Sequence, residues 1–121
     1  QTRAFSFVDD TINGTVLAME SDKAAGEIFH IGGSQEISIE ELIRAVGEMM
    51  GYSGEYVEAP TYPGSVSRRC PDISKAKRML GYNPQIDWKV GLVSTVEWYK
   101  AYFSKNKSAR QDGFKEQEKF N

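Results

Sequence analysis

Three arginines are the side chains of this 121-residue sequence best suited to bind an anion. Arg68 and Arg69 are adjacent and lie just before Pro71, and Arg3 lies near the start of the chain. A guanidinium group forms paired, charge-assisted hydrogen bonds with neighbouring phosphate oxygens, so these residues suit a diphosphate. Pro71 restricts the backbone before it, which predicts a comparatively stiff loop around Arg69, and a stiff loop holds a ligand group well. For each arginine, the alternative is an ordinary surface ion pair with a carboxylate.

Three other side chains are candidates for a role in ligand binding, nucleophilic chemistry or metal binding. Tyr62 lies in the loop that leads to the arginines, where a tyrosine can stack on a base, bind a phosphate or simply pack. Cys70 has no partner base in sequence, so a nucleophilic role is disfavoured. His30 is the only histidine and lies in an apolar run, which favours a core or boundary histidine over a metal ligand, so we predict no metal site.

A dinucleotide needs a glycine-rich turn between a strand and a helix, so that backbone amides can approach the pyrophosphate. The sequence contains no such motif, and the Gly32-Gly33 pair is interpreted as an ordinary turn. We therefore predict no cofactor-binding residue in this chain.

Apolar periodicity and capping residues predict a small mixed α/β domain with three short strands and about four helices. Ser38 and Glu41 form a capping box, and Gly51 is placed to end the helix that they begin. The strands are expected at 3–8, 27–31 and 55–58, and the helices at 10–20, 39–50, 72–80 and 87–103, with Asp9 or Asp10, Ser38, Asp72 and Asp87 as N-caps.

Composition narrows the class of protein. A net charge of −2 disfavours nucleic acid as a partner, since nucleic-acid-binding domains carry a basic excess. No apolar run approaches the ~20 residues that span a bilayer. A single cysteine fits a reducing compartment, so we expect a cytoplasmic protein without a membrane partner. Residues 1–103 are expected to form one domain, followed by a charged, flexible tail at 104–121.

Several motifs together resemble the carboxyl-terminal part of the extended short-chain dehydrogenases that modify nucleotide sugars, namely 4-epimerases, 4,6-dehydratases and UDP-glucuronate decarboxylases. The resemblance covers residues 1–103, about the last third of a typical family member. The matching segments are Gln1-x-Arg3-x-Phe5, Val8-x-Asp10, Phe29 to Gly33, Ser38 to Leu42, Asp72 to Ala76 and Leu80 to Pro84.

The resemblance implies a role for individual residues. It assigns Arg3 to the substrate diphosphate and Phe5 to the neighbourhood of the nucleoside, and Gln35 falls where some dehydratases contact the nucleotide. Arg69 is similar in place to the arginine that the decarboxylases use beside the sugar, where it is implicated in proton donation. Tyr62 stands where epimerases and dehydratases often have a phosphate-binding arginine, so we include it among the candidate substrate-binding residues.

The resemblance also implies what the chain lacks. The family uses NAD and a tyrosine with a lysine four residues later, and none of the six tyrosines here has such a lysine. We therefore expect a substrate-binding lobe that is inactive alone, with NAD bound by a missing amino-terminal domain and a homodimer formed by the full-length enzyme. The competing hypothesis is a non-catalytic helical interaction module that retains the family scaffold.

Overall fold

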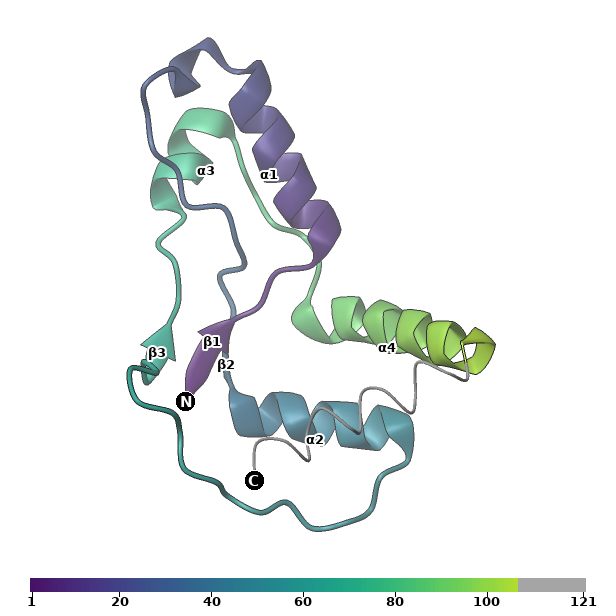
Figure 1. Cartoon of the computed structure of the whole chain (residues 1–121). Helices are drawn as coiled ribbons and strands as arrows, with labels where there is room; N and C mark the ends of the chain where they lie inside the picture. The colour runs from purple at the N-terminus through teal and green to yellow at the C-terminus, as the bar shows by residue number, and fades with distance from the viewer. Residues whose placement is uncertain (107–121) are drawn as a thin grey trace.

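The computed structural model describes residues 1–106 and consists of helices arranged around a small sheet (Figure 1). Four α-helices and three strands match the predicted mixed α/β class. The elements are β1 (Thr2–Ala4), α1 (Val8–Glu20), the 3₁₀ helix η1 (Asp22–Ala24), β2 (Glu36–Ser38), α2 (Ile39–Met50), β3 (Arg68–Arg69), α3 (Ser74–Leu80) and α4 (Trp88–Lys105).

The sheet brings the beginning of the chain together with the arginine-containing segment. Its strand order is β2-β1-β3, with β1 at the centre. β1 is antiparallel to β2, with Arg3 opposite Ile37. β1 is parallel to β3, and there Arg3 lies opposite Arg69. Two arginines that are 66 positions apart in sequence thereby become neighbours.

The hydrophobic core forms where α3 packs against α1. Its buried members are Ile73, Ala76, Leu80 and Tyr82, and the Tyr82 side chain is completely buried. The Tyr82 hydroxyl donates a 2.9 Å hydrogen bond to the Gly32 carbonyl, which fixes the segment after α1 to the core.

Most helix ends follow the sequence prediction. The Ser38 hydroxyl accepts the Glu41 amide and the Glu41 carboxylate accepts the Ser38 amide, which completes the predicted capping box. Gly51 ends α2 in the left-handed conformation with φ of 70°, which glycine adopts without steric cost. The Asp87 carboxylate caps α4 by accepting the Lys89 amide at 2.8 Å.

The prediction that Asp9 or Asp10 is the N-cap of this helix is wrong. α1 begins at Val8 with Phe7 as its N-cap, so both aspartates lie inside its first turn. The Asp10 side chain is only 6% exposed, and its two oxygens accept the backbone amides of Gln85 and Ile86 at 3.0 and 2.9 Å. Asp10 therefore ties the start of α1 to the segment that precedes α4.

Two predicted strands are absent from the described structure, at 27–31 and 55–58, and the predicted 3–8 strand is shortened to Thr2–Ala4. The strands at 36–38 and 68–69 were not predicted. A β-strand requires backbone hydrogen bonds to a neighbouring strand. When that neighbour is far away in sequence, local composition gives little indication of it. Segment 27–31 has the apolar composition of a buried strand, but it has no neighbouring strand among residues 1–106 to pair with.

The predicted tail at 104–121 falls mostly outside the described residues, because α4 ends at Lys105 and the description ends at residue 106. Among the described helices, none combines the length and apolar character needed to cross a bilayer.

Candidate anion-binding site

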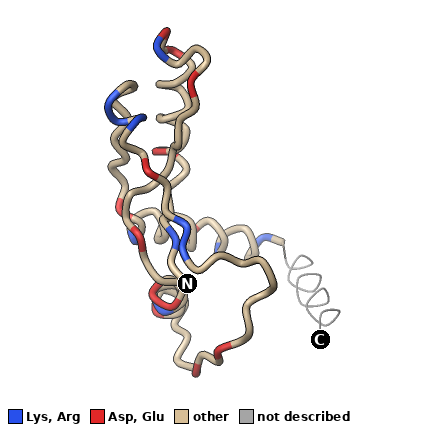
Figure 2. Tube along the Cα trace, turned by 90° about the vertical axis from the view of Figure 1, so that its left-hand side faces the viewer, with Lys and Arg blue, Asp and Glu red and all other residues tan. Residues whose placement is uncertain are grey.

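A basic cavity of about 820 Å³ lies beside β1 and β3. Its walls come from β1, from residues 29–32 after α1, and from residues 68–71, which continue from β3. Figure 2 shows the basic positions of β1 and β3 side by side close to the N-terminus. The lining includes Arg3, Phe29, His30, Arg68, Arg69 and Cys70.

Arg3 is held by backbone carbonyls. Its guanidinium donates to the Thr2 carbonyl at 2.7 Å and to the Val66 carbonyl at 2.9 Å. Within residues 1–106, no carboxylate lies within the 4.0 Å limit of an ion pair with Arg3. The side chain is thus fixed in position while its positive charge is not neutralised by an acidic residue.

Arg68 pairs with a carboxylate, which is the surface ion pair expected as the alternative to an anion contact. Its Nε and Nη2 donate to Glu36 Oε2 at 3.0 and 2.7 Å. These bonds, together with the Thr2 hydroxyl, hold the pKa of Glu36 below its ordinary value. The pair links β3 to β2 across the central strand, which is a structural role.

Arg69 is exposed and lines the cavity. It makes neither an ion pair nor a side-chain hydrogen bond in the part of the chain that the structure describes. Because Arg3 and Arg69 are opposite each other in the β1–β3 ladder, their side chains project from the same face of the sheet. Two like charges in this arrangement repel, and an anion between them relieves that repulsion.

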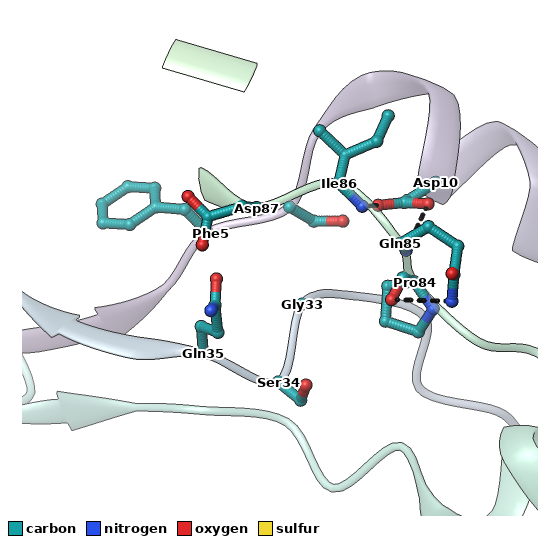
Figure 3. A pocket seen from close by; sticks show the side chains of 10 residues that line it. Phe5, Asp10, Gly33, Ser34, Gln35, Pro84, Gln85, Ile86 and Asp87 are labelled. Carbon is teal, nitrogen blue, oxygen red and sulfur yellow. Dashed lines mark hydrogen bonds between the residues drawn. The ribbon is translucent and has the colours of Figure 1, made fainter. Parts of the chain in front are cut away.

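Phe5 and Gln35 lie elsewhere, in a second cavity of about 190 Å³ (Figure 3). β1 ends at Ala4, so the strand alternation that predicted a common face for Arg3 and Phe5 does not continue to Phe5. The Gln35 amide lies at the start of α4, where its oxygen accepts the Trp88 amide at 3.5 Å. The Lys89 amide and then the Gln35 side chain lower the pKa of Asp87.

Tyr62 is 81% exposed and lines neither cavity. It belongs to a segment between α2 and β3 without regular structure, which the Gln1 amide contacts through Ser65 at 2.9 Å. The structure therefore brings Arg3 and Arg69 together but separates Tyr62, Phe5 and Gln35 from them.

His30 and Cys70 also line the basic cavity. His30 is exposed in the described structure, so the prediction of a core or boundary histidine is wrong there. Residues 1–106 contain no cluster of three histidine, cysteine, aspartate or glutamate side chains that could hold a metal ion. The arrangement is suited to binding an anionic ligand electrostatically.

The known proteins that this chain resembles are enzymes that act on nucleotide sugars. No family model matches the chain. UDP-N-acetyl-alpha-D-glucosaminuronate decarboxylase of Bacillus cytotoxicus is 34% identical over 106 residues, which cover 83% of this chain and 33% of that protein. UDP-glucuronic acid decarboxylase 1 of Xenopus tropicalis is 35% identical over 83% of this chain and 23% of its own length. The chain thus spans a third or less of these curated relatives.

Solved structures agree. UDP-glucuronic acid 4-epimerase from Bacillus cereus, in complex with UDP-glucuronic acid and NAD, matches with a TM-score of 0.78 and 35% identity over 84% of this chain and 33% of that chain. The dTDP-glucose 4,6-dehydratase DesIV from Streptomyces venezuelae matches with a TM-score of 0.77 and 32% identity over 86% of this chain and 32% of that chain. The chain is therefore homologous to part of the NAD-dependent nucleotide-sugar epimerases, decarboxylases and dehydratases of the extended short-chain dehydrogenase family.

Proposed function

We propose that this chain is the substrate-binding portion of an NAD-dependent enzyme that modifies a nucleotide sugar, as a 4-epimerase, a 4,6-dehydratase or a UDP-glucuronate decarboxylase. The single observation that carries the proposal is the cross-strand pair of Arg3 and Arg69 in one cavity. Neither guanidinium is neutralised by a carboxylate within residues 1–106, so the site favours a ligand with more than one negative charge.

Within this proposal the two arginines have different tasks. Arg3, fixed by the Thr2 and Val66 carbonyls, binds the diphosphate as a preorganised donor. Arg69 lies beside the sugar. If the enzyme is a decarboxylase, Arg69 donates a proton or stabilises the negative charge that develops as the reaction proceeds. Homology to two decarboxylases of uronic acid nucleotides supports that branch.

The remaining candidate contacts come from residues outside the basic cavity. Phe5 is proposed to lie near the nucleoside, and Gln35 and Tyr62 to contact the nucleotide. Tyr62 would reach the ligand only if its exposed segment moves toward the cavity, since it lines neither cavity here.

Residues 1–106 contain no G-x-G-x-x-G turn of the kind that approaches a pyrophosphate. Gly33 lies so close to the Phe5 carbonyl that a Cβ there would clash with it, which gives this glycine a packing role. We propose that NAD is bound by polypeptide outside this chain, that the chain alone is inactive, and that the complete enzyme is a cytoplasmic homodimer.

The test is a titration of the 121-residue chain with UDP and with UDP-glucuronate, followed by NMR chemical shifts. We expect shifts confined to β1, β3 and residues 28–32, and binding about 10- to 100-fold weaker after Arg3→Ala or Arg69→Ala, since a hydrogen bond to a charged group contributes about 1.5–3 kcal/mol. Arg44→Ala is the matched control, because Arg44 pairs with Glu40 on the exterior of α2.

The competing hypothesis, a non-catalytic interaction module, makes a different prediction. It requires that neither nucleotide produces shifts in the cavity at millimolar concentration, and that result would remove the enzyme assignment. Unchanged affinity in both arginine variants would place the nucleotide elsewhere on the chain.

A further inference from the structure

The small sheet separates its charged side chains onto two faces. Successive residues of a strand point to opposite faces, and paired residues share a face. Arg3 and Arg69 are paired in the β1–β3 ladder and project from one face. Thr2 is paired with Arg68 in the same ladder, and the β1–β2 register places Glu36 on the side of Thr2. The face behind the arginine pair therefore carries an ion pair of its own.

The Glu36 carboxylate joins all three strands on that face. Its Oε1 accepts the Thr2 hydroxyl at 2.5 Å, and its Oε2 accepts Nε and Nη2 of Arg68 at 3.0 and 2.7 Å. Glu36 belongs to β2, Thr2 to the central strand β1 and Arg68 to β3 (Figure 1). Because the Glu36 side chain is only 25% exposed, solvent screens this pair less than a fully exposed one. These three residues are called the Glu36 clamp below.

Strand β3 has few other attachments. It contains two residues, and residues 51–67 before it form neither helix nor strand. Its backbone pairing with β1 has two register positions, and just before it the Ser67 carbonyl accepts the Thr2 amide at 2.9 Å. The Arg3 guanidinium adds a bond to the Val66 carbonyl. So short a strand pair is marginal alone, so the position of β3 depends on side-chain contacts as well.

The arginine pair opposes this strand pairing. Like charges directly opposite each other destabilise adjacent strands, and neither Arg3 nor Arg69 forms an ion pair within residues 1–106. Without an anion, their repulsion favours separation of β3 from β1. The Glu36 clamp acts in the opposite direction on the other face, because the attraction between Glu36 and Arg68 holds β3 against the central strand.

We propose that Glu36 is a positioning residue for the anionic ligand, because it holds β3 against β1 and so keeps Arg69 opposite Arg3 in the free protein. This inference rests on the proposed function, since the ligand is the nucleotide diphosphate assigned to the cavity. It has an unusual consequence. An acidic residue close to the site strengthens the binding of an anion, whereas its charge alone would weaken that binding.

The test compares the UDP affinity of three variants of the 121-residue chain, measured by NMR titration. Glu36→Gln removes the negative charge and the ion pair with Arg68. Thr2→Val removes the hydroxyl that binds Glu36 and changes no charge. Glu40→Gln is the matched control, because Glu40 also forms an ion pair with an arginine, Arg44, and neither residue lines the cavity.

We expect Glu36→Gln to weaken UDP binding about two- to fivefold, and Thr2→Val to weaken it in the same direction. An exposed ion pair holds a strand modestly, and apparent affinity falls with the fraction of molecules in the binding-competent arrangement. Glu40→Gln should leave the affinity unchanged. In the protein without UDP, both clamp variants should lose nuclear Overhauser contacts between β1 and β3 and retain those between β1 and β2. General destabilisation of the fold would not produce this selective loss.

Equal or tighter UDP binding in Glu36→Gln would overturn the proposal, since Glu36 would then act on the ligand only through its charge. Failure of the proposed function gives a different result, namely a wild-type chain that binds no UDP. The contacts measured without UDP then decide the remaining question. Their selective loss in Glu36→Gln would support the hold of Glu36 on β3, and wild-type contacts between β1 and β3 would refute it.

Discussion

Replacing Asp10 tests how this small domain is held together. Asp10 is the only charged side chain that is buried among residues 1–106. It bridges two segments that are 75 positions apart, because its carboxylate accepts the amides of Gln85 and Ile86. Asp10→Ala removes both acceptors and leaves those amides without a protein partner.

The expected cost follows from those two bonds. A hydrogen bond to a charged group contributes about 1.5–3 kcal/mol, and part of that is recovered where water reaches the vacated amides. We therefore expect Asp10→Ala to lower the free energy of unfolding by about 3–5 kcal/mol, a large share of the ~5–15 kcal/mol of a typical domain. Asp10→Asn retains one acceptor oxygen and should cost about half as much.

Urea unfolding followed by circular dichroism measures this change in the 121-residue chain. Asp9→Ala is the matched control, because Asp9 is the exposed neighbour in the same helix turn and shares any favourable interaction with the helix dipole. A free energy of unfolding for Asp10→Ala within about 0.5 kcal/mol of the Asp9→Ala value would refute the reasoning.

Three further predictions concern stability. Burial raises the pKa of the Tyr82 hydroxyl, so the folded state favours the protonated form. The free energy of unfolding should keep this contribution below about pH 10 and lose it as the pH rises further. In Tyr82→Phe this alkaline dependence should be absent. Arg68 lowers the pKa of Glu36, so stability should fall as the pH drops below about 4.3, and Glu36→Gln should flatten that acid limb; an unchanged limb would contradict the pairing. Gly33→Ala places a Cβ against the Phe5 carbonyl and should cost about 1–3 kcal/mol in the same urea assay, whereas Ser34→Ala should be nearly neutral.

Local signals predicted the helices well. The capping box of Ser38 and Glu41 and the terminal Gly51 define α2 through contacts within a few residues, so a sequence pattern contains all the information needed. The same holds for Asp87 at the start of α4. Asp10 was misassigned because an aspartate near a helix start has the same local signature whether it caps the helix or accepts amides from residues 85 and 86.

The sheet and the candidate site depended on long-range pairing that composition does not encode. Nothing near Arg68 in sequence indicates Glu36 as its partner, so its engagement was missed. The neighbouring Arg69 and the distant Arg3 meet only because β1 pairs with β3. The resemblance to nucleotide-sugar enzymes named both arginines as substrate contacts, and their convergence in one cavity supports that assignment without testing it.

The measurement that bears most directly on the central claim is steady-state kinetics of the complete enzyme with UDP-glucuronate. We expect Arg69→Ala to lower kcat by about a hundredfold or more with little change in KM, since one preorganised donor contributes roughly 3 kcal/mol where charge develops. Arg3→Ala should instead raise KM through the lost diphosphate contact. Wild-type kcat and KM in both variants would show that the arginine pair is only surface charge and would contradict the account.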